Sequence, residues 1–191
     1  KRVAGDIYKV ANHPSTVKIT YTLYGDYADG TYDDIDSSEA HLNMPATFMW
    51  IEGHDQDPLT IKFDMPESLN WKVATQLKPL GEKNTFYARN FQYLMDSPTE
   101  LSDYHLRTWM VKNTDGKQEE MRLVMHAEVS DSLMDAYTAK IKRMVREEEA
   151  VYGELPDYDY GNYTFIENVN PFVHGDRSEE RRVGKECRSR W

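Results

Sequence analysis

The sequence has almost no cysteine: only Cys187, close to its end, carries a thiol. A single thiol forms no disulfide within the chain and gives no cysteine-ligated zinc site. Long hydrophobic runs are missing too, and without about 18 consecutive apolar residues the sequence predicts no membrane-spanning segment. Basic residues are outnumbered, with 23 Lys and Arg against 33 Asp and Glu, which argues against a nucleic-acid partner because phosphates require a basic face.

Motifs that carry a complete catalytic apparatus are also missing. The sequence contains no H-E-x-x-H zinc motif and no G-x-S-x-G nucleophile motif. The acidic residues 25–36 do not have the spacing of a calcium-binding loop. A metal site assembled from separated residues, such as His41, Glu52 and His54, is the alternative that spacing leaves open. We therefore expect no catalytic, cofactor-binding or metal-ligating residues in this chain.

Alternation of apolar and polar residues dominates the first 130 residues and is typical of β-strands. The segments with this alternation are residues 17–25, 59–66, 71–77, 105–113 and 119–129. Between the last two, Asp115-Gly116 is a strong signal for a hairpin turn. Residues 46–53 are almost continuously apolar, which predicts a strand covered on both faces. The fold class predicted is mainly β, an antiparallel β-sandwich or curled sheet.

The periodicity becomes helical from Ser132 to Tyr152. Asp131 or Ser132 is expected to cap the helix, with Asp135 completing a capping box. Gly153 then ends it, as glycine commonly does.

One further strand is expected at about residues 162–167, after this helix. The predicted domains are an N-terminal β domain over residues 1–130 and the beginning of a second domain over residues 131–176. The chain starts at Lys1 rather than Met, so we expect its natural start to lie upstream, and the sequence identifies no compartment.

Three tryptophans offer a second interpretation, a free-standing β-sandwich module that binds carbohydrate or protein. Such a module needs a row of exposed aromatic rings, and Trp50, Trp71 and Trp109 are the candidates. Trp71 alternates with apolar neighbours, which favours a place in the core.

Three stretches together resemble one family, the zinc metallopeptidases of the glycyl aminopeptidase type, which are gluzincins. The first stretch, residues 17–53, leads from a Tyr-rich strand through an acidic loop to His41-Leu42-Asn43. The second joins "WKVATQLKP" to "TFYARNFQYLMDSPTEL", and the third is "EEEAVYGELPDYDYGNYTFIENVNPFVHGD". The residues that keep the family spacing in the second stretch are Ala88, Leu94, Asp96, Ser97, Pro98 and Glu100.

The resemblance implies a β domain that packs on a thermolysin-like α/β catalytic domain, of which the helix and strand after residue 130 would be the first pieces. In the family, the sequence continues after Gly175-Asp176 toward an H-E-x-x-H helix and a downstream glutamate, which bind zinc. This chain departs from the family directly after Asp176. We therefore expect a non-catalytic fragment, a scaffold and cleft wall, whose parent binds zinc and hydrolyses peptides.

Two surface features would follow from a missing catalytic domain. Residues 93–101, "YLMDSPTEL", are the candidate interface segment. The helix 132–152 is expected to expose an apolar stripe and to promote self-association.

The final residues, 177–191, have a different composition from the rest. They contain six basic and three acidic residues, in a chain whose net charge is −10. Residues 177–187 resemble the translation of a common sequencing adapter, and the change coincides with the break in the family pattern. We therefore expect this tail to be an artefact rather than natural sequence.

Overall fold

The computed structural model describes residues 1–13, 15–27 and 31–169. The tail at 177–191 and the break at Gly175-Asp176 lie outside these residues. The described chain is mainly β with antiparallel sheets and few helices, which confirms the predicted fold class. Among the described residues, no helix combines the length and the apolar character needed to cross a bilayer.

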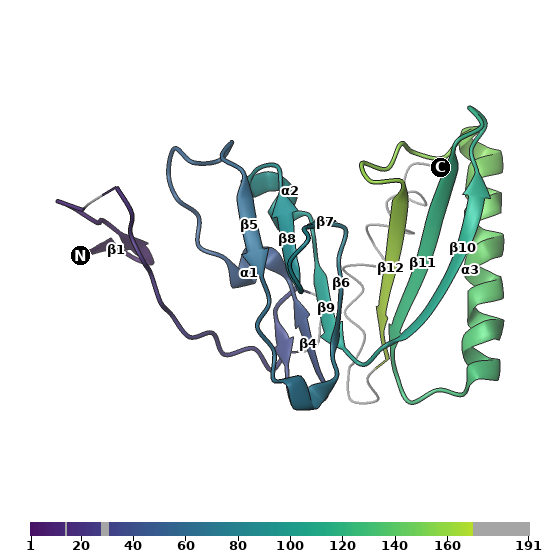
Figure 1. Ribbon diagram of the computed structural model, residues 1–191, viewed down its shortest axis with the longest axis horizontal. Coiled ribbons are helices and arrows are strands. Elements are labelled where there is room, and N and C mark those ends of the chain that lie inside the picture. The colour runs from purple at the N-terminus through teal and green to yellow at the C-terminus, as the bar shows by residue number, and fades with distance from the viewer. Residues whose placement is uncertain (14, 28–30, 170–191) are drawn as a thin grey trace.

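The first part of the protein contains a separate two-stranded antiparallel sheet, formed by β1 (Arg2–Ala4) and β2 (Ile7–Tyr8), and two larger antiparallel sheets (Figure 1). The order β3-β4-β9-β6 places β3 (Asp34–Ile35), β4 (Glu39–Leu42), β9 (Thr99–Ser102) and β6 (Lys72–Ala74) in one sheet. The order β5-β8-β7 places β5 (Leu59–Lys62), β8 (Thr85–Ala88) and β7 (Lys78–Pro79) in the other. The remaining elements are α1 (Met44–Thr47), the 3-10 helix η1 (Glu67–Leu69) and α2 (Phe91–Met95).

A single hydrophobic core joins the two larger sheets. Leu42 of β4 and Leu101 of β9 pack with Ile61 of β5 and Ala88 of β8, and Leu94 of α2 is fully buried among them. Burial of such side chains is the main favourable term in folding, so the two sheets form one unit.

The predicted hairpin is confirmed. β10 (His105–Lys112) and β11 (Gln118–His126) pair antiparallel over the full length of β10. Gly116 has φ 89°, the left-handed region that glycine adopts without a steric penalty, and the Asn113 N–H donates to the Lys117 carbonyl at 2.9 Å.

The predicted helix and last strand are also confirmed, as α3 (Asp131–Tyr152) and β12 (Asn162–Asn168). β12 pairs parallel with β11, an arrangement that needs a crossover connection, and α3 is that connection. In Figure 1, the sheet β10-β11-β12 lies between α3 and the first part of the protein. Residues 105–168 therefore form one packed unit, in which α3 and β12 pack on β11.

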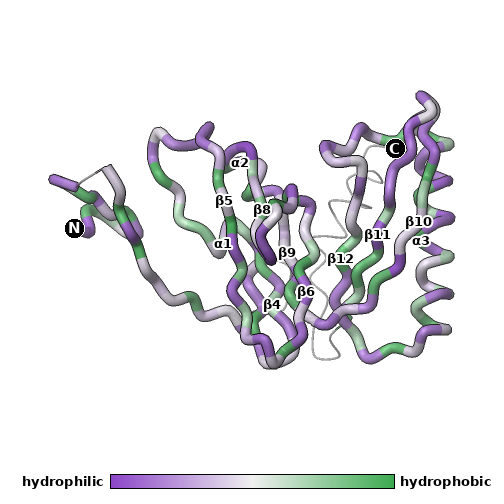
Figure 2. Tube along the Cα trace, viewed as in Figure 1, coloured by the Kyte–Doolittle hydropathy of each residue, from purple (hydrophilic) through white to green (hydrophobic). Residues whose placement is uncertain are grey.

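The apolar stripe of α3 is not exposed, contrary to expectation. Met134, Thr138, Ile141 and Val145 are buried, and the three apolar ones pack in a cluster with residues of β11 such as Leu123. Polar residues occupy much of the rest of the helix (Figure 2). The expected cause of self-association is therefore absent from this helix face.

The first turn of α3 differs in detail from the prediction. The N-cap is Ser130, whose side chain accepts a hydrogen bond from the Leu133 N–H at 3.3 Å, so neither Asp131 nor Ser132 caps the helix. The C-cap is as predicted, with Gly153 at φ 86°.

Two predicted strands are wrong. Residues 17–25, all within the described chain, form no strand and leave Val17, Ile19, Tyr21 and Leu23 exposed. Alternation makes a segment suitable for a sheet, but a strand also requires a neighbour that supplies its hydrogen bonds.

Residues 46–53 are the second case. Pro45 occupies the first turn of α1, a position that proline favours, and the chain after this short helix leaves Met49, Trp50 and Ile51 exposed. The apolar run therefore does not form the expected strand covered on both faces.

Candidate functional site

Polar side chains occupy one face of the β4–β9 pair. Ala40 and Leu42 of β4 point into the hydrophobic core, so Glu39 and His41 point to the opposite face. On β9, Leu101 belongs to the core, and its neighbour Glu100 points the other way. His41 lies directly opposite Glu100 in the antiparallel ladder.

The sheet β10-β11-β12 also carries polar side chains, on the face that points away from α3. On β11, Leu123 and Met125 pack toward α3, so Val124 and His126 face away from the helix. Val124 contacts Ala74 of β6 and Tyr104, which brings this face against the first part of the protein. His126 at the end of β11 pairs in register with Asn168 at the end of β12.

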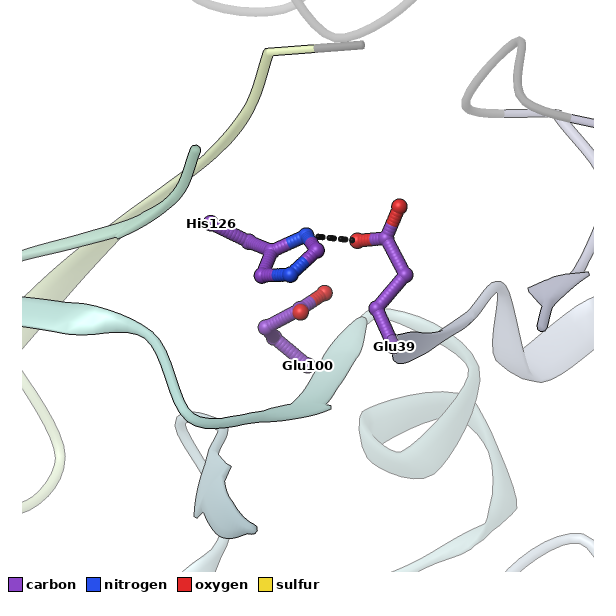
Figure 3. Close-up of side chains that lie close together, drawn as sticks. All are labelled: Glu39, Glu100 and His126. Carbon is purple, nitrogen blue, oxygen red and sulfur yellow. Dashed lines mark ion pairs between the residues drawn. The ribbon is translucent and has the colours of Figure 1, made fainter. Parts of the chain in front are cut away.

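These two polar faces meet in what we call the polar junction: Glu39, His41, Glu100, His126 and Asn168. The Nδ1 atom of His126 lies 2.9 Å from Oε2 of Glu39, and the Nδ1 atom of His41 lies 3.2 Å from Oε2 of Glu100. The side-chain amide of Asn168 donates to Oε2 of both glutamates, at 2.7 Å for Glu39 and 3.1 Å for Glu100. Figure 3 shows the two carboxylates and the imidazole of His126 converging from three different strands.

The two glutamates of the junction lie in unusually dry surroundings for carboxylates. Glu100 is 0% exposed and Glu39 is 3% exposed. Burial, reinforced by the negative charge of Glu100, raises the pKa of Glu39 to about 7. Burial also acts to raise the pKa of Glu100, but hydrogen bonds, led by the one with His41, outweigh it and hold this pKa below its ordinary value.

One oxygen of the junction has no partner. Oε1 of Glu100 makes no hydrogen bond to any described residue, although Oε2 of the same carboxylate is shared by His41 and Asn168. The junction also brings a potential ligand atom from each of Glu39, Glu100 and His126 within 4.8 Å of one another. Carboxylate oxygen and imidazole nitrogen are ordinary ligands of divalent metals.

The structure does not bring together His41, Glu52 and His54, the residues of the metal site that the sequence left open. His41 lies in the junction, but His54 is in an exposed loop and pairs with Asp57 at 2.6 Å, and Glu52 is also exposed. Among the described residues, the potential metal-ligating group is instead Glu39, Glu100 and His126. Of these three residues, the sequence analysis singled out only Glu100, as one of the residues that keep the family spacing.

The expected interface segment 93–101 is largely inside the protein. Leu94, Ser97, Thr99 and Glu100 are each 0% exposed. Most of this segment therefore stabilises the domain itself, and few of its side chains are available to a partner.

The three tryptophans do not form one exposed row. Trp71 packs against the core of the first part, whereas Trp109 packs in the α3 cluster and stacks on Phe165 at 6.4 Å between ring centroids. Only Trp50 is fully on the surface, and its indole N–H donates to Asp55 at 2.6 Å.

The fold is that of the β-rich N-terminal part of a metallopeptidase, and comparison with known proteins identifies the family. The model of the Peptidase M61 N-terminal domain matches residues 1–103. The chain belongs to this family. The resemblance to the N-terminal region of an aminopeptidase-type metallopeptidase, expected from the sequence, is thereby confirmed.

A solved structure supports the same fold over a larger part of the chain. The aminopeptidase N family protein from Idiomarina loihiensis superposes with a TM-score of 0.64 and 21% sequence identity, over 80% of this chain and 25% of that protein. At this identity the likeness concerns the fold. The chain spans about a quarter of the length of that neighbour. No curated protein matches this chain.

Proposed function

We propose that this chain is the non-catalytic N-terminal region of a zinc-dependent, aminopeptidase-like metallopeptidase. Its role is to support a thermolysin-like catalytic domain and to form one wall of the substrate cleft. The observation that carries this proposal is the match of residues 1–103 to the N-terminal domain of a peptidase family. Peptides would be substrates of the complete peptidase, and zinc its cofactor.

The chemistry of peptide hydrolysis supports a division of labour between this chain and a catalytic domain. A gluzincin holds Zn²⁺ with two histidines and a glutamate, and it needs another glutamate as general base for the zinc-bound water. The 191 residues contain no H-E-x-x-H motif that would supply these groups. The polar junction contains two histidines and two glutamates, but they lie on the strands β4, β9 and β11 rather than on a helix with the H-E-x-x-H spacing.

The rival hypothesis, a carbohydrate-binding module, has less support. Carbohydrate binding would use neighbouring exposed aromatic rings, and Trp71 and Trp109 belong to two separate hydrophobic clusters. Trp50 alone offers an exposed ring among the three.

A hydrolysis assay tests the non-catalytic part of the proposal. The purified chain, incubated with aminoacyl amide and dipeptide substrates with and without added zinc, is expected to give the rate of the protein-free blank. A chelator should therefore change nothing.

Turnover that a chelator abolishes would contradict this expectation. The variant Glu100→Gln serves as its control, because activity that disappears with this change would belong to the polar junction. Activity that survives the change would come from a different part of the chain or from a contaminating peptidase, which repurification would remove.

A further inference from the structure

The polar junction has the composition and placement of a metal site that is separate from peptidase catalysis. We propose that Glu39, Glu100 and His126 bind a divalent cation of the zinc class. This ion ties the β4–β9 sheet to the unit formed by residues 105–168, and so acts as a structural cross-link.

The distances fit a single ion. Zinc binds histidine nitrogen and carboxylate oxygen at about 2.0–2.2 Å, which places neighbouring ligand atoms about 3–3.5 Å apart. His126 and Glu39 are already in contact at 2.9 Å, and the ligand atoms of all three residues lie within 4.8 Å of one another. A small rearrangement of side chains brings them around one centre.

An unpartnered buried oxygen supplies independent support. Glu100 is 0% exposed, yet its Oε1 has no hydrogen-bond partner among the described residues. The side chain of Ser102 interacts with this carboxylate and helps to lower the pKa of Glu100, but its hydroxyl makes no well-formed hydrogen bond to Oε1, so this buried oxygen keeps a desolvation cost. A cation bound to Oε1 removes this cost, while His41 and Asn168 hold Oε2 and fix the direction of the carboxylate, as outer partners of metal ligands do.

The charges of the polar junction also favour a bound cation. The ion-pair partners of Glu39 and Glu100 among the described residues are histidines, His126 and His41, which carry a positive charge only when protonated. The negative charge of Glu100 is also one of the causes that raise the pKa of Glu39, so the two buried carboxylates repel each other. A divalent cation compensates both.

The donor set selects the class of cation. Calcium takes six to eight oxygen ligands, and magnesium prefers an octahedron of oxygens, mostly from water and phosphate. One imidazole and two carboxylates suit zinc better, with water completing the shell.

Calorimetric titration with ZnCl2 tests this proposal. The full chain carrying Cys187→Ser, which removes its only thiol, is stripped of metal with a chelator and titrated with zinc. We expect one equivalent to bind, with neither calcium nor magnesium competing at similar concentrations. Zinc is also expected to raise the thermal unfolding midpoint, since a ligand that binds only the folded state stabilises it.

Three variants assign the site. His126→Ala and Glu100→Gln should weaken zinc binding by at least about tenfold, the lower limit for loss of a group that supports a metal site. His54→Ala removes an exposed histidine that pairs with Asp57 and should leave the affinity unchanged. Glu100→Gln keeps the size and shape of the side chain. If circular dichroism shows that His126→Ala does not fold, the zinc affinity of Glu100→Gln tests the site instead.

Two results would overturn the proposal. One is a failure of the folded starting chain to bind a stoichiometric zinc ion. The other is undiminished binding by a folded Glu100→Gln variant. The hydrolysis assay described above is independent of both results, because zinc binding without turnover is consistent with a structural site, and turnover would contradict the proposed function while leaving the metal site in place.

Discussion

Replacing Leu123 with alanine is expected to lower the free energy of unfolding by about 2–5 kcal/mol, the range for truncating a fully buried leucine. Leu123 is 0% exposed and lies in the middle of β11, between β10 and β12. It packs in the cluster that attaches α3 to the sheet, with Met134 and Ile141 on the helix side. The loss combines the missing apolar contacts with the cavity that rigid neighbours leave behind. Denaturation in urea, followed by far-ultraviolet circular dichroism, measures it from the midpoint and slope.

Leu133→Ala is the matched control for this change. Leu133 lies in the first turn of α3 and is 58% exposed, so the same truncation should change stability by no more than about 0.5 kcal/mol. Equal effects of the two substitutions would show that α3 does not pack on β11 as described.

Asn113→Ala is expected to lower the free energy of unfolding by about 2–4 kcal/mol, because two buried backbone groups lose their partners at about 1–3 kcal/mol each. The side-chain amide of Asn113 donates to the Leu155 carbonyl at 2.9 Å, and its oxygen accepts from the Leu155 N–H at 3.0 Å. These bonds connect the end of β10 to the chain that follows α3, 42 residues later. Both residues are buried, so water cannot replace the lost bonds without opening the structure.

An exposed ion pair between the same two segments provides the control. Lys117 contacts Asp157 at 2.7 Å, and its side chain is 58% exposed. Lys117→Ala should therefore cost no more than about 1 kcal/mol. The interpretation of the Asn113 bonds would be wrong if the two variants unfolded at the same denaturant concentration.

The second half of the fold was predictable because its signals are local. Asp115-Gly116 between two alternating segments specifies the hairpin, and Gly153 ends a helix whose apolar spacing is regular. The strand expected at 17–25 failed for a non-local reason, because the sequence of a segment does not reveal whether another strand lies beside it. The strand expected at 46–53 failed for a local reason, because Pro45 lies in the first turn of the short helix α1.

Sequence patterns could not predict the polar junction. Glu39, Glu100 and His126 come from three strands and share no fixed spacing, so only tertiary packing brings them together. The sequence-based expectation of no metal ligands considered motifs of neighbouring residues and one wrong combination of distant ones. Alternation along β4 and β11 does predict which side chains share a face, but not that these two faces meet.

If this chain is a scaffold for a catalytic domain, as we propose, the two parts should bind each other when they are produced separately. A thermolysin-like catalytic domain from an M61 peptidase is produced separately, mixed with the folded chain, and studied by sedimentation velocity. The account predicts a one-to-one complex, whose formation raises the peptidase kcat/KM of the catalytic domain. Thermolysin itself, as a control from another family, should not associate. Two folded components that sediment independently at every concentration, with unchanged activity, would contradict the account.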